Sequence, residues 1–165
     1  DQGAKHFVTP GTHSKWIDVE DGKITNFATY VTGETFAVMK AHSILGRLMA
    51  NDVDDEHEFL KGIDRAFADP AGLLHNLFSA RSLALYQELT ADKISSYLSG
   101  LIIGAEVGHA ISMRDSTQHY MVLASAGIGG KYMMAMKHAG LRVSMGDPLA
   151  TVKGERAVAQ AAGLI

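Results

Sequence analysis

The sequence predicts a single α/β domain in which a mixed sheet, opening with a β-hairpin, is flanked by helices. Asp21-Gly22 separates two β-rich runs, and Asp-Gly is typical of a type I′ hairpin turn because both central residues take positive φ. Helical patterns then follow from Thr32 onward, and the last third of the chain alternates strand, helix, strand and helix. That alternation is typical of parallel strands joined by helices, so the sheet is expected to be mixed.

The predicted strands are short runs rich in β-branched and aromatic residues, bounded by turn residues. Within the hairpin, Glu20 is expected opposite Lys23 and Val19 opposite Ile24, both favourable cross-strand pairs. Five strands are expected, at residues 5–9, 16–20, 23–31, 120–123 and 142–146.

The predicted helices are recognised by their apolar faces and by acidic or capping residues at their starts. Thr32 is a candidate cap of the first helix, residues 52–55 place acid at the start of the second, and Asp69-Pro70 opens the third. Four helices are expected over residues 32–49, 69–89, 90–111 and 147–162. Two more are expected, one that follows residues 52–55 and includes Phe67, and one that follows the loop 124–130 and ends at His138.

The helix expected over 90–111 carries glycines at every fourth position from Gly100 to Gly108. Such a stripe of small residues allows another helix or a backbone to approach closely. Glu106 lies among these glycines, and a carboxylate in a buried helix needs a partner. Arg81 or Arg47 could supply a structural ion pair, and a role of Glu106 in a binding site is the alternative.

Composition limits the function classes. The 165 residues suit one domain, the net charge of −3 argues against a nucleic-acid binder, and the lack of cysteine excludes disulfides and Cys-based zinc sites. The eight histidines form no His-x₃-His pair, so no metal site is predicted. No apolar run approaches the roughly 20 residues of a membrane span, and no signal peptide is recognised, so a cytoplasmic location is expected. The missing initial methionine suggests a piece of a longer protein.

Two segments carry residues suited to an anionic ligand. In residues 11–15, Gly-Thr-His-Ser-Lys, hydroxyls and exposed backbone N–H groups could hold phosphate oxygens, and Lys15 could neutralise charge. A plain polar turn is the alternative. Residues 124–130 form a glycine-rich link between a strand and a helix, where backbone N–H groups attract phosphate. That segment matches no standard nucleotide motif, so a structural turn is its alternative.

Several motifs together resemble a known family. "PGTHSKW" is followed by "VEDGKI", "TGETFAVMKAHSILGRLM", "LFSARSL" and "YLSGLIIGAE", and then by the closing strand, glycine loop and helix. This series resembles the C-terminal half of the 2-dehydro-3-deoxygalactonokinases, which are sugar-acid kinases of the actin/hexokinase/Hsp70 superfamily. The resemblance covers essentially all 165 residues in order.

The resemblance implies an actin-like ATPase (ribonuclease H-like) lobe, the second of a two-lobed kinase whose N-terminal lobe is absent from this chain. It implies ATP with Mg²⁺ as cofactors, a small sugar acid as partner, and no nucleic acid or membrane; a homo-oligomer is a further expectation. The implied reaction phosphorylates the terminal hydroxyl of 2-dehydro-3-deoxy-D-galactonate, giving the 6-phosphate. Because the general base would lie in the other lobe, the isolated chain is expected to be inactive.

The resemblance also assigns roles to individual residues. Thr12, Ser14 and Lys15 would contact the phosphoryl group. Gly11, Thr12, Ala124, Ser125, Gly127 and Gly129 would bind the nucleotide, and His13, Thr32, Gly33 and Glu34 would line the substrate cleft. A superfamily kinase with another sugar substrate, or a non-catalytic sensor that keeps the fold, are the alternatives.

Overall fold

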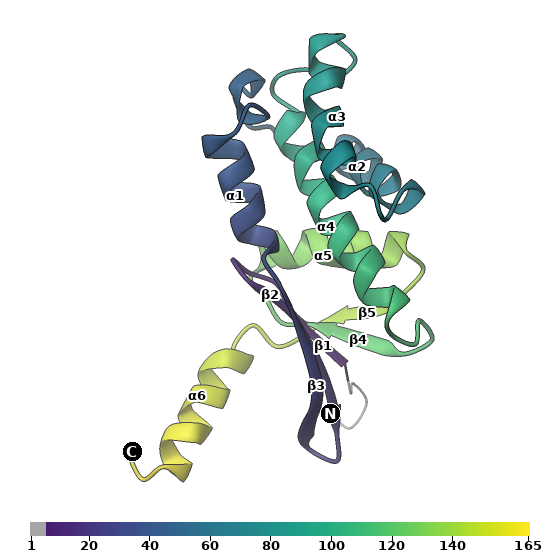
Figure 1. The fold of residues 1–165 in the computed structure, drawn as a ribbon. Coiled ribbons are helices and arrows are strands. Elements are labelled where there is room, and N and C mark those ends of the chain that lie inside the picture. The colour runs from purple at the N-terminus through teal and green to yellow at the C-terminus, as the bar shows by residue number, and fades with distance from the viewer. Residues whose placement is uncertain (1–5) are drawn as a thin grey trace.

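The computed structural model describes residues 6–165 and contains a five-stranded mixed sheet with helices packed on one face (Figure 1). The strand order is β3-β2-β1-β4-β5, with β1, β2 and β3 antiparallel and β4 and β5 parallel to β1. The predicted mixed sheet is therefore confirmed, although Lys5 of the first predicted strand lies outside the described residues. The strands are β1 (His6–Thr9), β2 (Ser14–Glu20), β3 (Lys23–Tyr30), β4 (His119–Val122) and β5 (Arg142–Met145).

The hairpin between β2 and β3 forms as predicted. Asp21 and Gly22 have φ of 48° and 74°, the positive values that a type I′ turn requires. Glu20 pairs with Lys23 and Val19 with Ile24, and the register shifts between Asp18 and Val19.

The helices agree with the prediction in number and order but differ at their ends. They are α1 (Thr32–His42), α2 (Glu56–Ala68), α3 (Leu73–Leu85), α4 (Ile94–Ser112), α5 (Ala126–His138) and α6 (Ala150–Ala161), with a short 3₁₀ turn, η1 (Gly46–Leu48).

A tertiary contact accounts for one wrong helix start, and a local turn accounts for another. Thr32 was expected to cap α1, but the N-cap is Val31, because the Thr32 hydroxyl donates a hydrogen bond to Glu106 instead. The third helix was expected to begin at Asp69-Pro70, but Asp69 is the C-cap of α2, and its carbonyl oxygen accepts from the Gly72 N–H in a turn, so α3 begins only at Leu73.

Further boundaries differ because an apolar or glycine-rich pattern does not fix where a helix starts or ends. Leu89 is buried beyond the end of α3, so its apolar character reports burial in a turn and not a helix through that residue. The expected loop 124–130 is mostly helix, since α5 already begins at Ala126. α1 ends at His42, α4 begins at Ile94 and α6 begins at Ala150.

α4 is the central helix of the fold, as predicted for a largely buried segment. Its length and mean hydropathy would suffice for a membrane span, so the expectation that no segment reaches this limit was too strict. However, 72% of the apolar window is buried inside the domain, which is typical of a core helix. The C-terminal half of α4 packs over the sheet with α2 and α5, and its N-terminal half forms a second apolar cluster with α3 and α1.

The glycine stripe of α4 faces α2, as the sequence predicted. A Cβ atom on Gly100 would clash with the carbonyl oxygen of Phe59, and one on Gly104 would lie 3.0 Å from the Cβ of Ala66. Gly108 has more room, since its nearest neighbour would be the Phe67 ring at 3.4 Å. The two helices can therefore approach closely only because Gly100 and Gly104 lack side chains.

Substitution of Gly104 should test this close packing. Gly104→Leu is expected to lower the free energy of unfolding by about 1–3 kcal/mol, because the added side chain overpacks the contact with α2. The matched control is Gly108→Ala, which should be neutral or slightly stabilising, since alanine favours a helix where space allows it. Urea unfolding measures both changes, and equal stability of Gly104→Leu and the wild type would contradict the packing.

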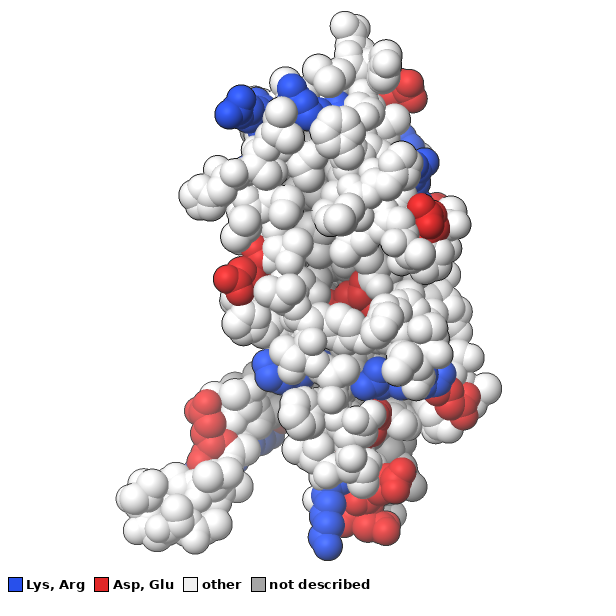
Figure 2. All heavy atoms as spheres, viewed as in Figure 1, with Lys and Arg blue, Asp and Glu red and all other residues white. Residues whose placement is uncertain are grey.

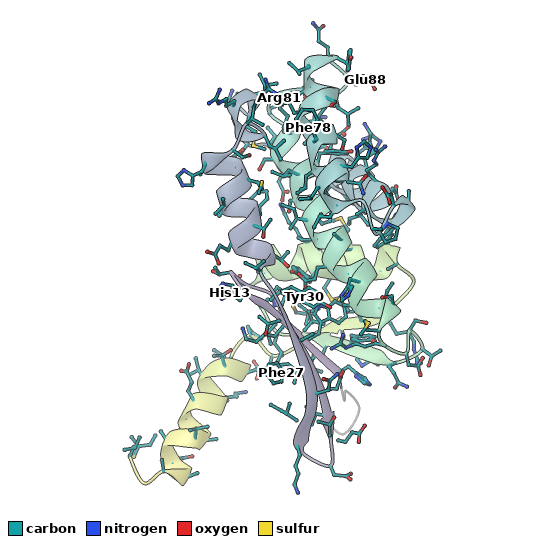
Figure 3. All side chains as sticks on the ribbon, in the orientation of Figure 1. His13, Phe27, Tyr30, Phe78, Arg81 and Glu88 are labelled. Atoms are coloured by element: carbon teal, nitrogen blue, oxygen red, sulfur yellow. The ribbon has the colours of Figure 1, made fainter. Side chains whose placement is uncertain are left out.

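One face of the sheet is left open. Three apolar residues lie next to one another on this face, namely Phe7 on β1, Ile17 on β2 and Phe27 on β3. The opposite face of the sheet carries the buried Val8 and Trp16. Phe27 is 65% exposed, and Figure 3 shows it on the side of the sheet away from helices α1–α5. α6 has no buried residue and extends away from the rest of the chain (Figure 1). This apolar face and α6 are thus both available for contact with another part of a protein.

Candidate ligand-binding cavity

The turn that carries residues 11–15 packs directly on the start of α1. The Glu34 N–H donates to the carbonyl oxygen of Thr12 at 3.0 Å, and a Cβ atom on Gly33 would clash with Gly11. His13 Nε2 lies 2.8 Å from Glu34 Oε2, although both side chains are about half exposed. The turn is therefore held in one conformation by backbone and side-chain contacts with α1.

A cavity of about 280 Å³ lies beside this turn, between the starts of α1 and α5 and the middle of α4. We call it the glycine-lined cavity. It brings together the two segments that the sequence singled out, since Gly11 comes from the turn and Gly127 from the glycine-rich start of α5. Its lining residues are Gly11, Thr32, Gly33, Phe36, Ser99, Ile102, Ile103, Gly127, Ile128, Lys131 and Tyr132.

The predicted nucleotide-binding residues at 124–129 are only partly at this cavity. Ala124 packs against the main apolar core, and Ser125 takes the N-cap position of α5. Gly129 faces β5, where an added Cβ atom would lie 2.7 Å from the Met145 side chain. Gly127 alone of the four predicted residues in this segment lines the cavity.

The predicted cleft residues divide in a similar way. Thr32 and Gly33 line the cavity, whereas His13 and Glu34 lie outside its lining and contact each other. Figure 3 shows His13 where the strands meet the start of α1. The sequence analysis missed the apolar walls and Lys131, although Lys131 directly follows the glycines that it had singled out.

Glu106 connects the elements around the cavity. Its buried carboxylate accepts hydrogen bonds from Ser14 Oγ at 2.6 Å and Trp16 Nε1 at 2.7 Å, both on β2. It also accepts from the hydroxyls of Thr32 on α1 and Tyr132 on α5. This arrangement shows that the predicted ion pair is wrong. Arg81 instead donates to the Ile44 carbonyl oxygen and lies at the far end of the helical layer (Figure 3). Arg47 is not among the four donors to the Glu106 carboxylate.

Ser14 needs a correction for the same reason. It was expected to contact a phosphoryl group, but its side chain is fully buried and its hydroxyl donates to Glu106. Side chains alternate along a strand, so Ser14 and Trp16 point to the core while Lys15 points to the other face of the sheet. Lys15 is only half-buried, and its Nζ donates to the His13 carbonyl oxygen at 3.2 Å. Ser14 therefore supports the turn from inside, and Thr12 and Lys15 are the members of the trio that a ligand can reach.

Burial raises the pKa of Tyr132 well above its usual range, and the neighbouring Glu106 charge adds to the effect. The phenol therefore keeps its proton in the folded protein at pH values where an unfolded tyrosine, with a pKa near 10, loses it. Unfolding then releases a proton at alkaline pH, so this stabilising contribution is complete below about pH 10 and declines above it.

Tyr132→Phe should remove one part of this alkaline dependence. The wild-type free energy of unfolding is expected to fall by about 1.4 kcal/mol more per pH unit than that of the variant above pH 10. Urea unfolding at pH 8, 10 and 11 measures the difference. Burial also raises the pKa values of Tyr30 and Tyr120. These two residues therefore make the free energy of unfolding decrease with pH by the same amount in both proteins. Parallel stability curves for the two proteins would contradict the assignment.

Lys131 supplies the positive charge of the cavity lining. It extends from the first turns of α5 and forms an ion pair with Asp54 at 2.9 Å. Its Nζ also lies 5.8 Å from the centre of the Phe59 ring. Because Asp54 is 77% exposed, this ion pair is weak and an anionic ligand in the cavity could compete for the ammonium group.

These residues fit part of a nucleotide better than they fit a metal ion. Apolar walls, two glycines and one lysine suit a base, a sugar and a phosphate, although about 280 Å³ would enclose only part of ATP. Within residues 6–165, no group of three or more His, Asp and Glu side chains is placed to hold a metal ion. Figure 2 shows both charge signs in small groups and no extended basic patch on the face in view.

The mixed sheet with helices on one face defines an α/β domain, and the glycine-lined cavity at its helix starts is its candidate ligand site. The family to which it belongs is shown by direct comparison. The model of the 2-keto-3-deoxy-galactonokinase family matches residues 1–160, and this chain belongs to that family.

Individual relatives agree with this family. The chain is 32% identical over 154 residues to the 2-dehydro-3-deoxygalactonokinase of Escherichia coli (strain K12), covering 92% of this chain and 49% of that protein. It is 31% identical over 148 residues to "Probable 2-dehydro-3-deoxygalactonokinase DgoK1" of Rhizobium meliloti (strain 1021), covering 88% and 48%. The chain thus spans about half the length of these relatives.

A solved structure shares the fold. A crystal structure of a candidate 2-dehydro-3-deoxygalactonokinase from Sinorhizobium meliloti superposes with a TM-score of 0.88 at 30% identity. The similarity covers 98% of this chain and 55% of that chain.

Proposed function

We propose that the protein containing this chain is a sugar-acid kinase that transfers a phosphoryl group from ATP to the terminal hydroxyl of 2-dehydro-3-deoxy-D-galactonate. The main support is that the turn 11–15 and the start of α5 meet at one cavity, in a chain of the 2-keto-3-deoxy-galactonokinase family. We place the reaction in the cytoplasm, and the product would be the 6-phosphate.

In this proposal the nucleotide lies along the glycine-lined cavity and reaches the turn with its phosphates. Gly11 and Gly127 leave open space where an added Cβ atom would meet no neighbour, so a ligand can approach their backbone. The Thr12 hydroxyl and the Lys15 ammonium group would contact the transferred phosphoryl group, where negative charge spreads over its oxygens. The His13–Glu34 contact would keep the turn in place against α1.

We further propose that this domain is an actin-like ATPase lobe of the ribonuclease H-like type. The order β3-β2-β1-β4-β5, with an antiparallel hairpin at one edge and parallel strands at the other, supports this. A second, N-terminal lobe would complete the kinase. The open apolar face of the sheet and the free helix α6 are surfaces that could contact it.

The second lobe is also needed on chemical grounds. Phosphoryl transfer to a hydroxyl requires a group that takes its proton, and a carboxylate is a common choice. None of the described residues that line the glycine-lined cavity is Asp or Glu. Glu106 is nearby, but four hydrogen bonds already occupy its carboxylate. Glu34 lies at the turn, but its carboxylate contacts His13. We therefore expect the general base outside residues 6–165.

The proposal predicts that the 165-residue chain alone does not phosphorylate the sugar acid, whereas a protein with both lobes does. A coupled assay of ADP release, with a panel of sugar acids, measures both activities. Rapid turnover by the isolated chain would contradict the need for a second lobe. A two-lobed protein that binds ATP but phosphorylates no member of the panel would favour a sensor, and a preference for another sugar would change the substrate assignment.

A further inference from the structure

The glycine-lined cavity has a feature that the proposed function does not use, namely the direction of the hydrogen bonds at Glu106. Oε1 accepts from Ser14 and Trp16, and Oε2 accepts from Thr32 and Tyr132. An ionised carboxylate offers about four acceptor positions, so these donors use all of them. Glu106 is only 4% exposed, and none of the ion pairs formed by residues 6–165 includes it.

The bonds to Oε2 determine what two cavity residues can offer to a ligand. Thr32 and Tyr132 both line the cavity. A hydroxyl has one hydrogen and two lone pairs, and each of these hydroxyls gives its hydrogen to Glu106. Toward any other group the two oxygens can therefore only accept. The raised pKa of Tyr132 keeps its proton in place throughout the neutral range.

We propose that Glu106 determines ligand specificity at this cavity by fixing Thr32 and Tyr132 as hydrogen-bond acceptors, so that they select a ligand group that donates, a hydroxyl or an amine. The ligand's identity rests on the proposed function, but its hydrogen-bonding chemistry rests on the Glu106 contacts. Phosphate oxygens are mainly hydrogen-bond acceptors near neutral pH, and at this position they meet the negative charge of Glu106. They are better placed at the turn and at Lys131.

Two ligands of the proposed kinase carry donors of this kind. A nucleoside has ribose hydroxyls and an exocyclic amine, and the sugar acid has several hydroxyls. Either could place a donor against Thr32 and Tyr132, while an anion without hydroxyls could not. Binding measurements with adenosine, 2-dehydro-3-deoxy-D-galactonate and pyrophosphate therefore separate the two sources from each other and from simple anion binding.

Glu106→Gln is the sharpest variant, because Trp16 fixes how the new side chain must lie. The indole N–H can only donate, so the glutamine oxygen must face Trp16 and its NH₂ group must face Thr32 and Tyr132. These hydroxyls then accept from the amide, and their hydrogens become free to point into the cavity. The variant keeps the size of the side chain and reverses the hydrogen-bond direction at two positions.

The test is titration calorimetry on the two-lobed protein. In Glu106→Gln we expect the Kd of adenosine or of the sugar acid to rise about tenfold, as loss of a good hydrogen bond implies. The Kd of pyrophosphate should change less than twofold or fall. Ser14→Ala is the matched control, since it removes a hydrogen bond to Oε1 and leaves both hydrogen bonds to Oε2 in place. It should leave the ratio of the adenosine or sugar-acid Kd to the pyrophosphate Kd unchanged. Melting temperatures check that each variant is folded.

Thr32 gives a second route that does not depend on Glu106 itself. Thr32→Val removes the acceptor and should weaken the same probe, while Thr32→Ser keeps the hydroxyl and should restore binding. The inference is overturned if Glu106→Gln leaves the Kd values unchanged, if it weakens all three probes equally, or if the wild type binds neither probe with donors. Failure of the proposed function would appear separately. In that case the wild type would bind the probes with the expected ratio of Kd values but would not phosphorylate the sugar acid.

Discussion

Replacing Glu106 with alanine is expected to lower the free energy of unfolding by about 3–5 kcal/mol, the largest stability change that we predict for a single substitution. The loss follows because four buried donors, on β2, α1 and α5, lose their common acceptor at once. A buried donor without a partner costs about 1–3 kcal/mol, and the hydroxyls can recover part of this by turning to other acceptors.

Urea unfolding of the 165-residue chain measures this effect directly. Glu88→Ala is the control, because Glu88 is exposed beyond the end of α3 and its removal should change stability by less than about 0.5 kcal/mol. Glu106→Gln should be much less destabilising than Glu106→Ala, since the amide keeps one acceptor and adds donors. If Glu106→Ala were as stable as Glu88→Ala, the four contacts would contribute nothing to the fold.

Lys15→Met and Thr12→Val are expected to lower kcat of the two-lobed kinase by about 10²–10³-fold each. Fixed donors are most effective where negative charge develops, and phosphoryl transfer spreads that charge over the oxygens that these side chains would contact. Both variants should lower kcat and kcat/KM together and leave KM for the sugar acid within a small factor. Steady-state kinetics of the two-lobed protein measures these constants.

The control for this prediction is Lys23→Met, which removes the same charge at the exposed tip of the same hairpin. It should leave both constants near the wild-type values. If Lys15→Met raised KM with kcat unchanged, the turn would be a substrate clamp. If neither constant moved, residues 11–15 would be a polar turn without a role in the reaction.

The parts of the fold that the sequence predicted are those that neighbouring residues decide. The Asp21-Gly22 turn formed with the expected pairs because its backbone angles depend on those two residues. The glycine stripe of α4 was confirmed because a helix places every fourth residue on one face whatever packs against it. The motifs also gave the correct family, since their order along the chain needs no structure.

The tertiary structure decided everything that depends on a partner distant in the chain. Thr32 suits a helix cap, yet its hydroxyl donates to Glu106, 74 residues away. Ser14 suits a phosphate site, yet the alternation of β2 turns it into the core. The partners of Glu106 could not be predicted because arginine and neutral donors both suit a buried carboxylate, and only packing shows that four neutral donors surround it. The sequence by itself determined the turn, the stripe and the family, because these depend on local geometry and order. Which polar groups face the cavity was decided by packing, because a polar side chain buried on folding bonds to whichever group the fold places beside it.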